Sequence, residues 1–85
     1  MSREFGFPVC SNGRITKGPT VIGDSHSVVI PMSCPAGSKV VALHHSHPGG
    51  SLELSKQDIR TAREKGVPFV CVRAQKRVKC YRITR

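Results

Sequence analysis

The stretch HHSHPGGSLELSKQD, residues 44–58, holds three of the four histidines of the chain and one of its two aspartates. Its first part reads as the end of a strand. Successive side chains of a strand point to opposite faces, so His45 and His47 share one face and His44 points to the other. Pro48 does not continue an ordinary ladder. Two imidazoles are therefore expected to project together from a strand end, as pairs of metal ligands commonly do.

The second part of the stretch reads as the start of a helix. A hydrolytic zinc site usually has three protein ligands and an open position for water, and Asp58 is placed to be the third ligand. Ser55, one turn earlier, would lie at the mouth of the same site. The S-x-x-D spacing of Ser55 and Asp58 is also typical of a helix start, with a hydroxyl cap and an acid near the positive end of the helix dipole. From the spacing alone, Ser55 and Asp58 can be either part of a metal site or a helix cap.

A metal-dependent hydrolase also needs a general base, for which a carboxylate beside the metal is suited. Glu53 falls in a loop that would hold it weakly. Glu64 falls near the end of the expected helix, about 9 Å along the axis from Asp58. Glu4 begins the first apolar segment, where a sheet can hold it next to His45. Elimination favours Glu4.

The sequence around this stretch predicts a mixture of strands and one helix. Ser55 suits the N-cap of a helix and Gly66 suits its C′ position. Two final strands, VPFVCV and VKCYRI, are expected to turn at Gln75-Lys76, which would set Cys71 opposite Cys80. The earlier apolar segments are expected to be strands: those flanking the 11–13 turn, residues 20–22, residues 28–30 and residues 40–47. Residues 40–43 are continuously apolar, as in a strand covered on both faces.

Composition limits the possibilities further. The 85 residues are expected to form one small domain, residues 1–85, with 14 basic and 5 acidic residues and a net charge of +9. Such a charge suits an acidic protein or nucleic acid as partner, although no nucleic-acid-binding motif appears. We expect the basic set at the end of the chain to be a solvated face: Lys76, Arg77, Lys79, Arg82 and Arg85.

The cysteines and the first residues bear on location. No segment reaches 18 apolar residues and the start, MSREFGFPVC, lacks the apolar region of a signal peptide, so no membrane association and a cytoplasmic location are expected. In that compartment the four cysteines, at positions 10, 34, 71 and 80, are expected to be reduced. A Cys71–Cys80 disulfide remains an alternative. No CxxC pair indicates a zinc ribbon.

With Glu4, the His45-Ser46-His47-Pro48 run, Ser55 and Asp58 in place, the sequence resembles the JAMM (MPN+) metalloprotease family. The signature of that family is an upstream Glu, then H-[ST]-H-P, then S-x2-D seven residues on. The resemblance implies a small cytidine-deaminase-like α/β domain, with a curved, mostly antiparallel sheet and one clear helix after the H-x-H-P strand. It also implies one zinc ion per chain, held by His45, His47 and Asp58.

The resemblance further implies roles and substrates. Glu4 would be the general base and then acid, and Ser55 would stabilise the oxyanion. The reaction would be hydrolysis of an isopeptide or peptide bond at the C-terminal tail of a ubiquitin-like modifier. Family members usually carry a helix before the catalytic Glu, and three residues precede Glu4 in this sequence, so we expect a minimal member or one that completes itself as a homodimer. The alternative is a zinc protein of the same fold that acts without catalysis, or with nucleic acid, through its basic surface.

Overall fold

The computed structural model describes residues 3–84, which form a six-stranded sheet and one helix. The strands are β1 (Phe5–Ser11), β2 (Ile15–Lys17), β3 (Val21–Ile22), β4 (Lys39–Ser46), β5 (Phe69–Ala74) and β6 (Arg77–Arg82), and the helix is α1 (Lys56–Lys65). The sheet order is β2-β1-β4-β5-β6, with β3 also paired to β1. All pairs are antiparallel except β4 with β5. The predicted class, a mostly antiparallel α/β domain, is confirmed.

The turns form where the sequence predicts them. The first hairpin turns at residues 12–14, where Gly13 adopts a positive φ of 101°. The last turns at Gln75 and Lys76, with Ala74 paired to Arg77. Tight hairpins require such left-handed residues, and Gln75 supplies one with a φ of 57°.

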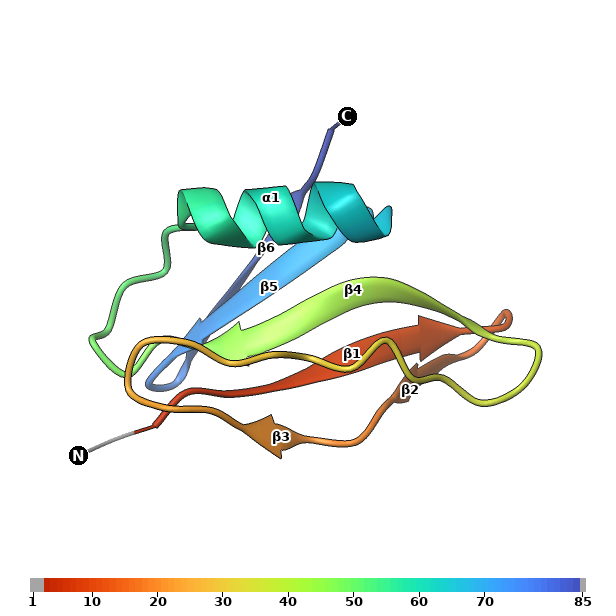
Figure 1. Ribbon diagram of the computed structural model, residues 1–85, viewed down its shortest axis with the longest axis horizontal. Helices are drawn as coiled ribbons and strands as arrows, with labels where there is room; N and C mark the ends of the chain where they lie inside the picture. The colour runs from red at the N-terminus through yellow and green to blue at the C-terminus, as the bar shows by residue number, and fades with distance from the viewer. Residues whose placement is uncertain (1–2, 85) are drawn as a thin grey trace.

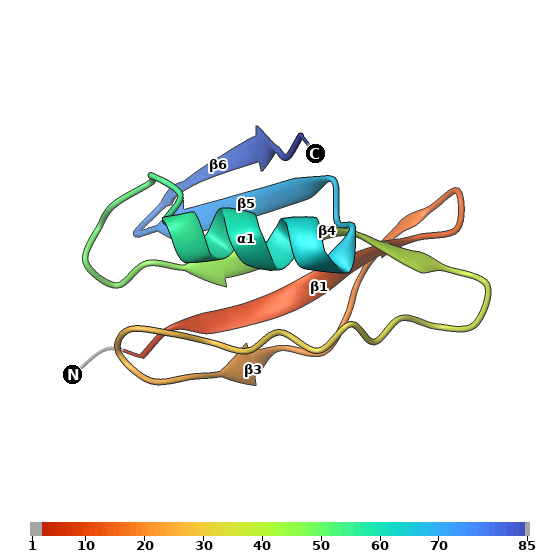
Figure 2. The ribbon, with the colours of Figure 1, turned by 45° about the horizontal axis from the view of Figure 1, so that its top comes forward.

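Helix α1 connects the two parallel strands and lies on one face of the sheet (Figures 1 and 2). Ser55 is the N-cap and Gly66 adopts the left-handed conformation at the C-terminal end, as predicted. The fully buried Ala62 packs with Leu43, Val67 and Val70 to form the core. Because the loop between β4 and α1 is short, the N-terminus of the helix lies directly beside the carboxyl end of β4.

The other wall of this face is a segment without regular secondary structure, residues 23–38, which runs beside β1 (Figure 2). The prediction of a strand at residues 28–30 is therefore wrong: the segment makes no ladder there. It packs by its side chains instead. Ile30 joins the core and lies so close to Gly6 that a Cβ at that glycine would be 2.8 Å from the Ile30 side chain. Glycine at position 6 makes this close approach feasible.

The opposite face of the sheet carries no helix within residues 3–84. The expectation that residues 40–43 are covered on both faces is wrong in this respect. The continuous apolar run has a different cause: the β1–β4 register shifts between Val9 and Cys10, so that Val40 and Leu43 both pack toward the core. None of the described residues forms a helix long and apolar enough to cross a membrane.

All four cysteines are paired, which corrects the expectation of reduced thiols. Cys71 and Cys80 face one another in the β5–β6 ladder and form a disulfide. Cys10 and Cys34 form the second, 24 residues apart in sequence. The second could not be seen in the sequence, because only the fold of residues 23–38 brings Cys34 onto buried Cys10. It fastens the end of this segment to β1.

Loss of the Cys10–Cys34 bond is expected to make residues 23–38 less firmly packed against the sheet. A cross-link that closes about 25 residues restricts the unfolded chain by about 3.5 kcal/mol, and one that closes about ten residues by about 2.7 kcal/mol. Cys34→Ala should therefore lower the free energy of unfolding by about 3.5 kcal/mol and expose residues 23–38 to limited proteolysis. Cys80→Ala, the control, should destabilise the protein without exposing that segment. Equal cleavage of both variants would contradict the assignment of the wall to this disulfide.

Candidate metal centre

The site forms where β4 ends. His45 is on β4 and is 5% exposed, and His47 follows directly after Ser46. The backbone N–H of His47 donates to the carbonyl of Arg73, which prolongs the extended geometry beyond the strand. The two imidazoles therefore share the face toward α1, with ring centroids 4.8 Å apart. This is the arrangement that the H-x-H spacing predicts.

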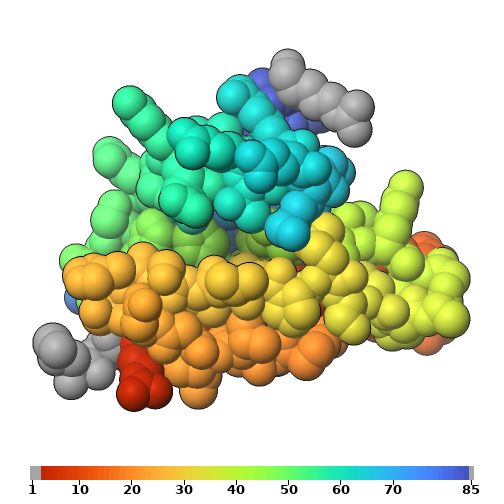
Figure 3. Space-filling view, viewed as in Figure 1, coloured from red at the N-terminus to blue at the C-terminus, as the bar shows by residue number. Residues whose placement is uncertain are grey.

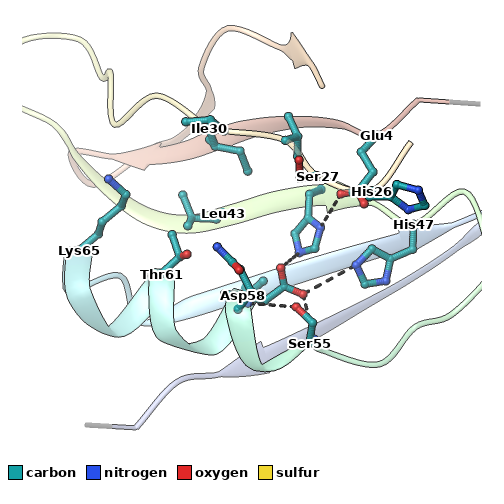
Figure 4. Close-up of a pocket in the computed structure, with 15 residues that line it drawn as sticks. Glu4, His26, Ser27, Ile30, Leu43, His47, Ser55, Asp58, Thr61 and Lys65 are labelled. Carbon is teal, nitrogen blue, oxygen red and sulfur yellow. Dashed lines mark hydrogen bonds and ion pairs between the residues drawn. The ribbon is translucent and has the colours of Figure 1, made fainter. Parts of the chain in front are cut away.

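Asp58 reaches the same point from the first turn of α1 (Figure 4). Its Oδ1 lies 3.4 Å from Nε2 of His45, and its Oδ2 lies 3.7 Å from Nε2 of His47. Ligand atoms about 2.0–2.2 Å from a tetrahedral ion are about 3.3–3.6 Å from one another. Each of the two carboxylate-to-imidazole distances is thus close to the spacing of two ligands on one ion.

A second observation also fits a metal ion at this point. Nε2 of His45 is buried and has no hydrogen-bond partner among the described residues. Buried polar atoms are normally satisfied, so an unpaired nitrogen facing a carboxylate fits the role of a metal ligand. Burial lowers the pKa of His45, against the opposing effect of Asp58, and so favours the neutral imidazole that binds metals.

Glu4 lies on the other side of His45. It directly precedes β1 and is held by two backbone hydrogen bonds, from its N–H to the carbonyl of Asp24 and from the N–H of Gly23 to its own carbonyl. Its Oε1 is 3.9 Å from Nδ1 of His45, and the residue is only 8% exposed. Burial is the largest of the causes that raise the pKa of Glu4, which brings its carboxyl closer to proton transfer near neutral pH.

Two ligand sets are compatible with these positions. One ligand atom from each of Glu4, His45 and His47 can be chosen so that all lie within 4.8 Å of one another. The Asp58 carboxylate, however, lies closer to both histidines, and it faces the orphaned Nε2 of His45. Glu4 faces the opposite nitrogen of that ring. The group of Glu4, His45 and His47 can hold a metal ion, and the Asp58 carboxylate lies against both histidines.

Ser55 and Asp58 also form the helix cap that the spacing allows. The Asp58 N–H donates to Oγ of Ser55 over 3.1 Å, and the Ser55 N–H donates to Oδ2 of Asp58 over 3.0 Å. The two readings of this pair are thus compatible. The cap fixes the carboxylate, and Ser55 also lines the groove that opens from the site.

The site opens into a groove of about 680 Å³ between α1 and residues 26–30. Figure 3 shows the two walls, the helix above and the segment 23–38 below. Figure 4 shows Leu43, Ile30, Thr61 and Lys65 along the part of the groove away from the histidines. Sequence reasoning missed this apolar extension, because its wall comes from residues treated there as a strand. The only signal in the sequence for this part of the groove was the apolar run at residues 28–30.

The remaining histidines lie outside the ligand set. His26 is exposed at the rim of the groove. His44 points to the opposite face, where it stacks on Phe7 at 4.5 Å between centroids. His44 thus points away from the site, as the alternation of side chains predicts.

A small α/β domain with H-x-H-P at a strand end and an acid at the following helix start defines a JAMM/MPN-like protein. A family model described as prokaryotic homologs of the JAB domain matches residues 14–84, and the chain belongs to that family. Glu4 lies outside the matched range. Searches of curated proteins and of solved structures found no significant match.

Proposed function

We propose that this chain is a zinc-dependent metalloprotease that cuts an isopeptide or peptide bond at the C-terminal tail of a ubiquitin-like modifier. The observation that carries the proposal is the convergence of His45, His47 and Asp58 on one point, with the Glu4 carboxyl beside it. Membership in the JAB family, which includes hydrolases, supports the same reading. We propose one zinc ion per chain, held by the two histidines and Asp58.

When bound, such an ion supplies Lewis-acid chemistry, which lowers the pKa of a water molecule and polarises a carbonyl group. The residues of the chain would supply the proton transfers. Glu4 accepts a proton from the attacking water and delivers it to the leaving amine nitrogen, a task suited to a carboxyl whose pKa is raised by burial. The Ser55 hydroxyl donates a hydrogen bond to the carbonyl oxygen as negative charge develops there.

The groove would hold the substrate. A modifier tail is a narrow extended chain, and the space between α1 and residues 28–30 is lined by Leu43, Ile30 and Val70 on its apolar side. The net charge of +9 would favour an acidic modifier or another acidic protein as substrate. We propose that the chain acts as a single domain in the cytoplasm. Its two disulfides are more typical of oxidising compartments.

The test is a cleavage assay on the full chain after its metal content has been measured by mass spectrometry. The substrates are a lysine-linked conjugate of a ubiquitin-like protein and a linear fusion to the same tail. We expect about one zinc ion per chain and cleavage after the terminal glycine, lost on chelation and restored by zinc. A folded, zinc-loaded protein that leaves both substrates intact would contradict the peptidase proposal and leave a zinc-stabilised binding domain.

A further inference from the structure

The sheet face opposite α1 has a composition unlike that of a solvated surface. Residues that pair across strands share a face, so the register identifies its members. Its large apolar side chains are Phe5, Phe7, Phe69, Ile15, Ile22 and Val78. Of these, Ile15 and Ile22 are 69% and 70% exposed, and Phe69 is 41% exposed. Exposed apolar side chains gathered on one face in this way often mark a binding site.

The charges on this face all have one sign. Lys17 pairs with Val9, Arg73 with Ser46, and Arg82 with Phe69, which places three cations on the face. None of the five acidic residues of the chain lies in a strand. The cations therefore have no carboxylate partner on the face itself. They also act on His44, whose pKa is lowered by burial first and then by Arg73 and Lys17.

On each side of this face a cation lies beside or pairs with an aromatic residue. The Lys17 ammonium lies 4.6 Å from the centre of the Phe7 ring, whose stacking partner is His44. Phe69 and Arg82 are paired on the far side of the sheet. From β2 to β6 there are five strands, which at about 4.8 Å per interval gives a platform roughly 19 Å wide.

We propose that this open sheet face binds single-stranded nucleic acid, with Lys17, Arg73 and Arg82 contacting phosphates and Phe69 stacking against a base. Non-specific single-strand binding combines a cationic surface that follows the backbone with aromatic side chains on which bases stack. Both components are present on one face. They lie on the side of the sheet away from the groove, so this inference stands independently of the peptidase proposal.

A second copy of the chain fits the face less well. Two such faces packed together would bring like charges onto one another, and no acidic strand residue is available to pair with them. An acidic protein would match the charges but would not require the exposed ring of Phe69. A single strand matches both features.

The test measures binding of the full chain to fluorescein-labelled twelve-nucleotide DNA and RNA strands by anisotropy. Three phosphate contacts predict a slope of about −2 for log K against log salt. Phe69→Ala should weaken binding by about five- to one-hundred-fold. Arg73→Gln should reduce the size of the slope by about 0.7. Both residues are exposed, and circular dichroism would check that each variant folds.

The matched control is Arg60→Gln, which removes an equal charge from the exposed side of α1. It should leave affinity within about twofold, since it lies on the other face. Equal weakening by Arg60→Gln, or no effect of Phe69→Ala, would overturn the proposal in favour of diffuse charge attraction. Tighter binding of poly-glutamate than of either strand would point to an acidic protein instead. Dimerisation through this face, seen by sedimentation with no strand bound, would identify a second copy as the occupant.

Discussion

Glu4→Gln is expected to lower the rate of tail cleavage by about one-hundred- to ten-thousand-fold, the usual contribution of a positioned general base. The amide has the size of the carboxyl but cannot accept the proton from water. Glu4 is held by backbone hydrogen bonds to residues 23 and 24, so the substitution should leave its position unchanged. Turnover at saturating substrate and zinc content per chain would be measured on the same preparation.

The control for this variant is Glu53→Gln, an equal charge change at an exposed loop residue. It should retain turnover and zinc. A Glu4→Gln protein that loses both activity and zinc would show that Glu4 is itself a ligand, as the Glu4–His45–His47 grouping permits. A variant that keeps full activity would remove Glu4 from the mechanism.

Asp58→Asn is expected to weaken zinc binding by well over about one-hundred-fold, because loss of an outer-shell partner alone costs about 10–100-fold. The asparagine oxygen can still accept the hydrogen bond from the Ser55 N–H, so the helix cap should survive. The variant thus separates the two roles of this side chain. Titration with a zinc-competing dye would measure the zinc affinity, and a thermal melt in chelator would measure the contribution of the cap to stability.

Ser55→Ala is the complementary control. It removes the capping oxygen that accepts from the Asp58 N–H, at a cost of about 1 kcal/mol, but leaves the carboxylate facing the histidines. We expect the melting temperature to fall by roughly 4–8 °C while zinc remains bound. If Asp58→Asn keeps its zinc and only Ser55→Ala changes the protein, the pair is a cap and no more.

The local features of this fold follow from the sequence, and the distant ones do not. Ser55 and Gly66 mark the helix, and Gly13 and Gln75-Lys76 mark the turns, because caps and hairpins depend on residues close in the chain. His45 and His47 share a face for the same reason. By contrast, Ile30 packs beside Gly6, a contact between distant residues with no local signal.

The same distinction explains the errors over cysteines and strand coverage. The Cys10–Cys34 bond depends on how residues 23–38 fold back, which no spacing rule predicts. The open sheet face reflects the lack of a second covering layer within residues 3–84, and a run of apolar residues looks the same in sequence whether one or two layers cover it. The position of Asp58 was predictable because the helix start follows so soon after the strand. The prediction that Glu4 lies next to His45 rested on elimination of the other glutamates.

The disulfides have a consequence for how the chain is tied together. Cys10–Cys34 lies wholly before the loop of residues 47–54, and Cys71–Cys80 lies wholly after it. No covalent cross-link therefore joins the two halves, which meet through the parallel β4–β5 ladder and the packing of α1. His45 belongs to the first half and Asp58 to the second, so an ion bound by both would hold the two halves together until a chelator removed it. Two fragments cut within that loop would then reassemble in a metal-dependent way, as a split protein whose halves report on zinc.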